Sequence, residues 1–158
     1  MEYEEVVHPF APVYDSESKV LILGSFPSIV SRKNAFYYGN PANRFWKVME
    51  VLFEQEIKDK KQFCLNHHIA LWDVIGACSI QGSSDTSIRD VEPNDLSRIL
   101  DSADIKQIFV NGKKAEAVYR KYTEKKIGIK AICLPSTSPA NAAWTLDKLI
   151  EAWRRVCP

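Results

Sequence analysis

The segment 36–46 gathers side chains that are suited to holding a flat, polar ligand. It reads FYYGNPANRFW, with five aromatic residues, two asparagines and one arginine. Asparagine amides both donate and accept hydrogen bonds, and aromatic faces can stack on a nucleobase. Gly39 and Pro41 disfavour a helix interior, because one loosens the backbone and the other removes a donor. The segment is therefore predicted to start as a loop, with Tyr37 and Tyr38 as candidate stacking platforms.

A second segment, 134–142, has a similar character and reads LPSTSPANA. Like the stretch 24–46, it directly follows an expected strand and opens a helix. Turns fixed by proline and the starts of helices present backbone N–H groups suited to a phosphate or a base carbonyl. Taken singly, each segment reads as an ordinary turn in which Ser28, Ser136 and Ser138 cap helices. Together they favour one binding site at an edge of a sheet.

The elements that position these loops alternate along the chain. Short apolar runs at 19–24, 69–75, 106–112 and 130–135 are typical of strands buried on both faces. Segments 43–53, 93–103, 113–126 and 141–156 carry apolar residues at helical spacing. This alternation predicts a three-layer α/β/α domain with a mostly parallel central sheet. Ligands in such sheets bind at the carboxyl ends of the strands, where both loops lie.

Some side chains within these elements are assigned to packing or capping. Phe45 and Trp46 are expected in the core, since an isolated aromatic is more often buried than exposed. Asn94 and Asn111 are placed as helix caps. The last helix is expected to bury one face, formed by Trp144, Leu149, Trp153 and Val156.

Length and composition limit the function classes. The 158 residues, 46% of them hydrophobic, suffice for a single domain over 1–158 that buries roughly two thirds of its unfolded surface. The formal net charge of +1 makes no case for a polyanionic partner, so local clusters must do so. Such clusters occur at Arg32 and Lys33, at Arg44 and Lys47, and along 113–126, although solvated helix faces explain many of these cations equally well.

Targeting and metal signals are weak. Every apolar run is far shorter than the ~20 residues that a bilayer requires, and no signal peptide is recognisable, so a cytoplasmic protein without a membrane partner is expected. Cys64, Cys78, Cys133 and Cys157 form no C-x-x-C pair, and the three histidines do not complete a ligand set. We therefore expect buried thiols in a reducing compartment, no metal site and no cofactor.

Three patterns, GSFPS at 24–28, YYGNPxNRFW at 37–46 and LPSTSPA at 134–140, resemble the uracil-DNA glycosylase superfamily. The chain is most similar to its hypoxanthine-DNA glycosylase branch, and the likeness extends from HPFAPVYD at 8–15 to the last helix. The portion PANRFWKV is also similar to the mismatch-specific uracil and thymine glycosylases. These relatives carry a catalytic asparagine in the first motif, at a place that Phe26 occupies here. That departure argues against uracil excision and points to the hypoxanthine branch.

The resemblance implies a uracil-DNA glycosylase-like fold and specific roles. Breaking an N-glycosidic bond requires stabilisation of the departing base, and one well-placed donor is worth ~3–4 kcal/mol. Asn43 is the first choice and Asn40 the second for the catalytic amide that orients water or the base. Tyr38 would stack on the extruded base. The base would lie against Gly24, Ser25, Phe26 and Pro27.

The resemblance also implies contacts with DNA, single- or double-stranded, that contains a deaminated base. A base inside a duplex must be extruded before an enzyme can reach it. The loop 136–141 would grip phosphates and fill the gap that the base leaves. The expected DNA contacts are Ser28, Arg44, Lys113, Ser136, Ser138, Pro139 and Asn141, made by a monomer.

The implied function is that of a monofunctional DNA glycosylase of base excision repair, which hydrolyses deoxyinosine to release hypoxanthine. Water is the nucleophile, because no lysine in the motifs suggests a Schiff-base lyase. Two alternatives stay open. One is a mismatch-specific uracil or thymine glycosylase, and the other is a catalytically silent binder of damaged DNA, which the residue Phe26 favours.

Overall fold

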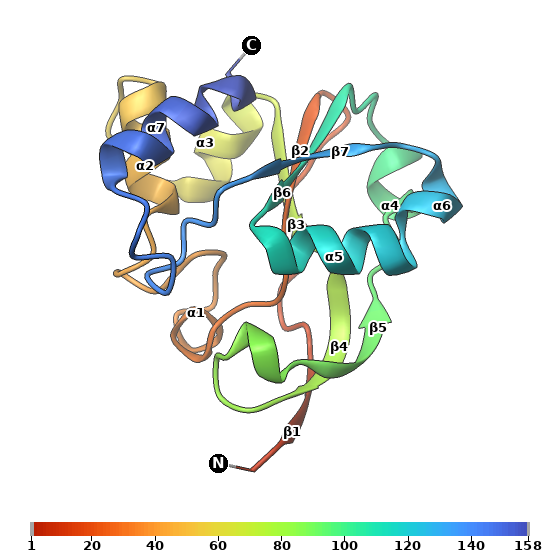
Figure 1. Cartoon of the computed structure of the whole chain (residues 1–158). Helices are drawn as coiled ribbons and strands as arrows, with labels where there is room; N and C mark the ends of the chain where they lie inside the picture. Colours follow the sequence, from red (N-terminus) through yellow and green to blue (C-terminus); the bar gives the residue numbers. More distant parts are fainter. Residues whose placement is uncertain (1, 158) are drawn as a thin grey trace.

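A four-stranded parallel sheet lies at the centre of the computed structural model, which describes residues 2–157 (Figure 1). Its strand order is β3-β2-β6-β7, and all three pairings are parallel. The near-continuous apolar runs form the strands, three of which are almost wholly buried on both faces, while the edge strand at 131–134 is mostly half-buried. The strands are β2 (Val20–Gly24), β3 (Ile69–Asp73), β6 (Gln107–Asn111) and β7 (Ala131–Leu134).

A second, antiparallel sheet was not predicted. It has the order β1-β4-β5, with β1 (Glu4–Val7), β4 (Ile75–Ile80) and β5 (Arg89–Pro93). The expected strand 69–75 ends at Asp73, and the chain enters β4 after Val74, whose N–H donates to Gly24 O at 2.9 Å. The outer strands escaped prediction because they are short, largely solvent-facing and rich in charged residues.

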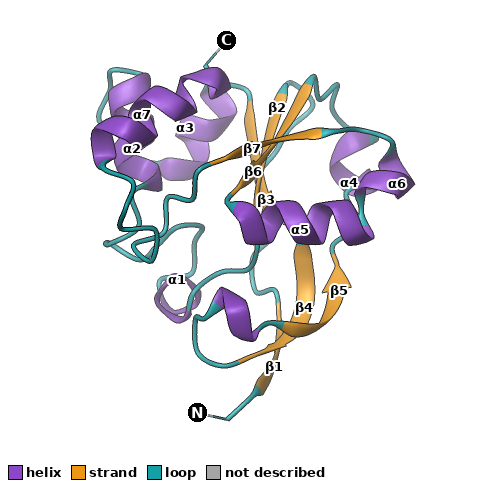
Figure 2. Ribbon diagram, viewed as in Figure 1, coloured by secondary structure: helices purple, strands orange, loops and turns teal. Residues whose placement is uncertain are grey.

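One face of the central sheet is covered by α2 (Phe45–Leu52), α3 (Lys60–Asn66) and α7 (Leu146–Trp153) (Figures 1 and 2). Phe45 and Trp46 are buried, as expected. The Phe45 ring meets the Trp153 ring edge to face, with centroids 5.7 Å apart. Such a pair adds about 0.5–1.5 kcal/mol beyond the area that it buries. The interaction ties α7 to the start of α2.

Trp144 departs from the prediction. Helix α7 begins only at Leu146, with the Thr145 hydroxyl accepting from Lys148 N as its cap. Trp144 therefore lies in the preceding loop, where its side chain is not part of the core and the residue is 37% exposed. Leu149, Trp153 and Val156, by contrast, are buried as expected.

The opposite face carries α4 (Ser97–Leu100), α5 (Lys113–Tyr122) and α6 (Glu124–Ile127) (Figure 1). The single helix expected over 113–126 is interrupted at Thr123. Neither expected asparagine cap is present. The residue that caps α5 is Gly112 at φ +96°, where a Cβ would also come within 3.0 Å of the Ser136 Cβ.

Both asparagines instead tie separate segments together. Asn94 Nδ2 donates to Asp73 O at 2.9 Å and to Ile75 O at 3.2 Å, which secures the turn between β3 and β4. The Asn111 amide pairs with Thr137, as described below. The sequence indicates that both amides can form hydrogen bonds, but it does not reveal their partners, which are distant in sequence.

A short helix α1 (Ile29–Lys33) follows β2 directly. Ser28 caps it, because its hydroxyl accepts from Ser31 N at 3.1 Å. A 3₁₀ turn, η1 (Asp85–Ser87), lies between β4 and β5, and a second, η2 (Arg154–Val156), follows α7. Among the described residues, no helix is long and apolar enough to cross a bilayer.

Candidate active site

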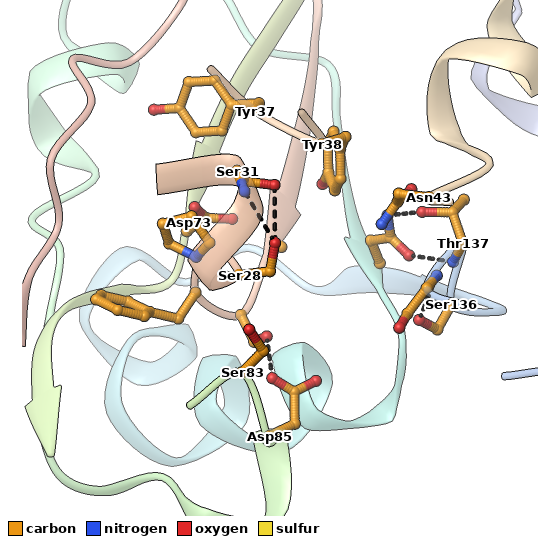
Figure 3. A pocket seen from close by; sticks show the side chains of 16 residues that line it. Ser28, Ser31, Tyr37, Tyr38, Asn43, Asp73, Ser83, Asp85, Ser136 and Thr137 are labelled. Carbon is orange, nitrogen blue, oxygen red and sulfur yellow. Dashed lines mark hydrogen bonds between the residues drawn. The ribbon is translucent and has the colours of Figure 1, made fainter. Parts of the chain in front are cut away.

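A pocket opens where the carboxyl ends of the central strands meet (Figure 3). Gly24 ends β2, Asp73 ends β3 and Asn111 ends β6, and all three line it. This is the edge at which a parallel sheet was expected to bind its ligand. The predicted residues that line the pocket are Gly24, Ser25, Phe26, Pro27, Ser28, Tyr38, Asn43, Ser136 and Ser138.

Five predicted site residues lie outside this pocket. Asn40 accepts a hydrogen bond from Ala42 N at 3.0 Å through its Oδ1, so its amide oxygen shapes the turn. Pro139 is exposed on the second loop. Lys113 and Asn141 line an adjoining groove. Arg44, the fifth, is engaged with the protein itself.

The guanidinium of Arg44 joins the two predicted motifs. Its Nη2 donates to Ser138 O and to Asn141 O, both at 3.1 Å, and its Nη1 donates to Trp144 O. The backbone N–H of Arg44 also donates to Thr137 O at 3.0 Å. These donors are thus occupied by carbonyls of the second loop, and Arg44 holds that loop against the start of α2.

The second loop is also fixed from within the pocket. Asn111 Nδ2 donates to Thr137 Oγ1 at 3.0 Å, and Thr137 N donates back to Asn111 Oδ1 at 3.1 Å. Asn141 Nδ2 donates to Ser136 O at 3.0 Å. Sequence reasoning had not placed Asn111 in the site. A side-chain amide at the end of a buried strand was the available signal.

The oxygen and the nitrogen of the Asn43 side-chain amide have different surroundings. Its Oδ1 accepts from Phe45 N at 2.9 Å and so satisfies a free donor of the first turn of α2. Its Nδ2 makes no hydrogen bond among the described residues, and the side chain lines the pocket. The amide donor is therefore the part of Asn43 that is available to a ligand.

Tyr38 stands on the pocket wall in a constrained conformation. Its ring stacks on Phe45, with centroids 4.1 Å apart and planes 17° apart. Its φ of +52° is uncommon for an aromatic residue, and such strain gathers at functional sites. The buried hydroxyl makes no hydrogen bond of normal geometry. Burial and the Asp73 charge raise the pKa of Tyr38 far above its ordinary value, while the nearby Asn111 amide opposes the rise, so the phenol stays neutral.

We expect Tyr38→Phe to excise its substrate base at close to the wild-type rate, because the ring face is retained. The same change removes a buried hydroxyl without a partner, so the melting temperature should not fall. Tyr38→Ala should reduce excision severely. Single-turnover kinetics and thermal unfolding of both variants measure these effects. A large loss of rate in Tyr38→Phe alone would instead assign chemistry to the hydroxyl.

Sequence reasoning missed the most buried charged group of the pocket. Asp73 Oδ2 lies 2.7 Å from His8 Nε2, and the two side chains are only 5% and 4% exposed. The Oδ1 atom lies 2.5 Å from the position that a Cβ on residue 24 would take, so only glycine fits there. One Asp73 oxygen is thus held by His8, and the other lies against Gly24, which also lines the pocket. The sequence feature that could have indicated this site residue is a lone carboxylate at the end of an apolar strand.

Two residues of the polar segment 82–87, Ser83 and Asp85, also line the pocket. Ser25 Oγ donates to Asp85 Oδ1 at 3.0 Å, and Ser83 Oγ accepts from Ile29 N at 2.8 Å. Asp85 as a whole is well exposed, but its carboxyl group faces inward. Burial of that group raises the pKa of Asp85, against the opposing hydrogen bond from Ser25.

Phe26 fills the floor beside the buried pair. The residue is 8% exposed, and its ring meets the His8 ring nearly at right angles with centroids 5.9 Å apart. The Cζ atom of the Arg32 guanidinium lies 5.7 Å from the centre of the Phe26 ring. The pocket therefore has an apolar wall at the position of Phe26, where no side-chain amide is available.

Comparison with known proteins identifies this architecture. The family model described as the uracil DNA glycosylase superfamily matches residues 11–157. The chain belongs to the uracil DNA glycosylase superfamily. This result confirms the resemblance noted in the sequence, and it agrees with the central parallel sheet flanked by helices.

Relatives within the superfamily narrow the comparison. A hypoxanthine DNA glycosylase of Methanosarcina acetivorans is 37% identical over 156 residues, which cover 93% of this chain and 95% of the relative. A hypoxanthine DNA glycosylase of Methanosarcina barkeri is 34% identical over 141 residues, covering 84% and 86%. The solution NMR structure of a candidate uracil DNA glycosylase from M. acetivorans superposes with a TM-score of 0.75 at 33% identity, covering 93% and 96%.

Proposed function

We propose that this protein is a monofunctional DNA glycosylase that hydrolyses the N-glycosidic bond of deoxyinosine and releases hypoxanthine in base excision repair. The match over residues 11–157 supports one glycosylase domain, and two relatives bear the name hypoxanthine DNA glycosylase. The observation that carries the proposal is the buried Asp73–His8 pair, of which Asp73 lines the pocket.

The pair suits the chemistry of a deaminated base. Deamination of adenine turns a ring nitrogen acceptor beside an amino group into an N–H donor beside a carbonyl. An ionised carboxylate only accepts hydrogen bonds, so Asp73 Oδ1 pairs with the ring N–H of hypoxanthine and repels the ring nitrogen of adenine. A site built around such a bond rejects the wrong base strongly, because the mismatched polar groups are left unpaired.

Other pocket groups supply the remaining steps. Asn43 Nδ2 is the proposed donor that orients water or stabilises the departing base, with Asn40 outside the pocket as the weaker choice. The Tyr38 ring and the Ser25–Phe26 backbone enclose the base. None of the described residues that line the pocket is a lysine, which supports water as the nucleophile and disfavours a Schiff-base intermediate.

The proposed substrate is DNA with an extruded nucleotide, bound by a protein monomer in the cytoplasm. Extrusion costs a few kcal/mol, which contacts with the DNA backbone must offset. Ser28, Lys113 and the loop that contains Ser136, Ser138, Pro139 and Asn141 are proposed to provide them. Arg44 contributes by holding this loop, because its Nη1 and Nη2 atoms donate to carbonyls of the protein and its Nε is buried.

A panel of otherwise identical oligonucleotides tests the proposal. Each carries inosine, uracil, xanthine or a thymine mismatch, as a single strand and as a duplex with each opposite base. Hypoxanthine release, measured as abasic sites under single-turnover conditions, should be fastest. Binding without abasic-site formation on any substrate would support a silent binder of damaged DNA instead.

Uracil excision is the second candidate, because uracil also presents a ring N–H beside a carbonyl and Asp73 accepts from either base. Phe26 is the residue that should distinguish the two candidate activities, uracil excision and hypoxanthine excision. We expect wild type to excise uracil poorly, and Phe26→Asn, which introduces an amide with donors and an acceptor, to raise the uracil rate. Loss of the buried ring should cost about 3 kcal/mol or more in stability. Single-turnover rates on paired uracil and hypoxanthine duplexes measure the change, and efficient uracil excision by wild type would contradict the role given to Phe26.

The proposed chemistry requires no metal ion. Within residues 2–157, no three His, Cys, Asp or Glu side chains are grouped so as to hold one. Excision of hypoxanthine should therefore persist at an unchanged rate in excess chelator. Loss of activity on chelation, with recovery on adding a divalent ion, would overturn the metal-free mechanism.

A further inference from the structure

A groove beside the candidate active site contains Trp144, which has no role in the mechanism above. Trp144, Lys113 and the end of β7 contribute to its walls. It shares Asp85, Ser136 and Ser138 with the pocket, so the two cavities adjoin. The exposed Trp144 thus stands next to the place where an extruded nucleotide would enter.

We propose that this groove is a second nucleotide subsite, in which the Trp144 indole stacks on the base next to the extruded nucleotide. This inference rests on the proposed function, since it takes DNA as the ligand. Every base has an aromatic face, so the subsite accepts any neighbouring sequence. The sequence had suggested a core role for Trp144, and its actual position leaves the indole available.

The loop that carries Trp144 is fixed before any ligand binds. Arg44 donates to the carbonyls of Ser138, Asn141 and Trp144 itself, and Trp144 N donates to Asn141 O at 3.1 Å. On the other side, Trp153 Nε1 donates to Pro135 O at 2.9 Å. An aromatic side chain on a fixed backbone loses little conformational entropy on binding, and this favours stacking.

The chemistry of the groove distinguishes where a base and a phosphate would lie. Leu134, Pro135 and Ala140 give apolar lining next to Trp144, while Lys113 places an exposed cation at the start of α5. Asp85, on the edge shared with the pocket, would repel a phosphate there. An uncharged base therefore suits the Trp144 wall, and the backbone phosphate suits the Lys113 side.

Binding to a duplex with a tetrahydrofuran abasic analogue at the target position tests the subsite without depending on which base is excised. We expect Trp144→Ala to weaken this binding roughly 5- to 150-fold and Trp144→Phe to retain most of it. Tyr3→Ala is the matched control, since Tyr3 is also 37% exposed and lines neither cavity. Thermal unfolding should show that all three variants are folded.

A second set of duplexes identifies the stacked base. Each also lacks one neighbouring base, on the 5′ or the 3′ side or in the opposite strand. We expect one duplex, which lacks a base next to the target position in the same strand, to bind wild type and Trp144→Ala equally. In that duplex the base on which Trp144 stacks is absent, so removing the indole has no further effect. An equal loss for Trp144→Ala on every duplex, or no loss at all, would overturn the proposal. So would sedimentation showing that wild type self-associates through the groove and Trp144→Ala does not. Failure of hypoxanthine excision in the oligonucleotide panel would overturn the proposed function alone.

Discussion

Replacing Asn43 with alanine is expected to lower the single-turnover rate of hypoxanthine release by about a hundredfold or more. Asn43 Nδ2 is an uncommitted donor on the pocket wall, and one transition-state donor is worth about that factor. Its Oδ1 also accepts from Phe45 N at 2.9 Å, so the alanine variant loses a helix-capping bond as well. That loss should cost about 0.5–2 kcal/mol of stability.

Asn43→Asp separates the two roles. The aspartate keeps an oxygen for Phe45 N, so the start of α2 and the melting temperature should be preserved. It replaces the amide donor by an acceptor with a negative charge, so excision should fall at least as far as in Asn43→Ala. A stable Asn43→Asp variant with a near wild-type rate would show that the donor is dispensable. The catalytic role would then pass to Asn40, for which Asn40→Ala is the direct test.

The parts of the site that sequence reasoning found are those that lie within one continuous motif. Gly24 to Ser28 lie at the pocket because a turn after a buried strand leaves little choice of position, and Tyr38 and Asn43 of the following motif line it too. The parallel sheet followed in the same way from its apolar runs, and the family match confirms that architecture.

The missed parts depend on contacts between distant segments. His8 and Asp73 are 65 positions apart, and neither lies in a motif that reveals its partner. Arg44 looked like a free cation for DNA because its acceptors are backbone carbonyls about 100 positions away, which composition does not show. The prediction placed Trp144 in the last helix for a more local reason. The helical spacing of apolar residues extends back to Trp144, but the helix α7 begins only after its cap, Thr145.

Asp73→Asn is the change expected to alter substrate choice as well as rate. The asparagine keeps the size of the side chain and can still accept from His8 through its oxygen. The amide nitrogen then faces the pocket, so a donor meets the ring N–H of hypoxanthine where an acceptor stood. We expect hypoxanthine release to fall at least about a hundredfold, since a mismatched buried donor cannot be satisfied by water in so enclosed a position.

A second substrate distinguishes this reading from simple damage to the pocket. Unsubstituted purine has the same rings as hypoxanthine, but its ring nitrogen is an acceptor and it lacks the carbonyl. Wild type should strongly prefer hypoxanthine over purine, and Asp73→Asn should narrow that preference, because its amide donor now suits purine. Asp73→Ala cannot serve for this test. It would leave His8 buried without its partner, and breaking a buried pair costs about 3–5 kcal/mol. If Asp73→Asn lowers both rates equally and leaves the preference intact, Asp73 shapes the pocket without reading the base, and the discrimination against adenine must come from the backbone of 24–27.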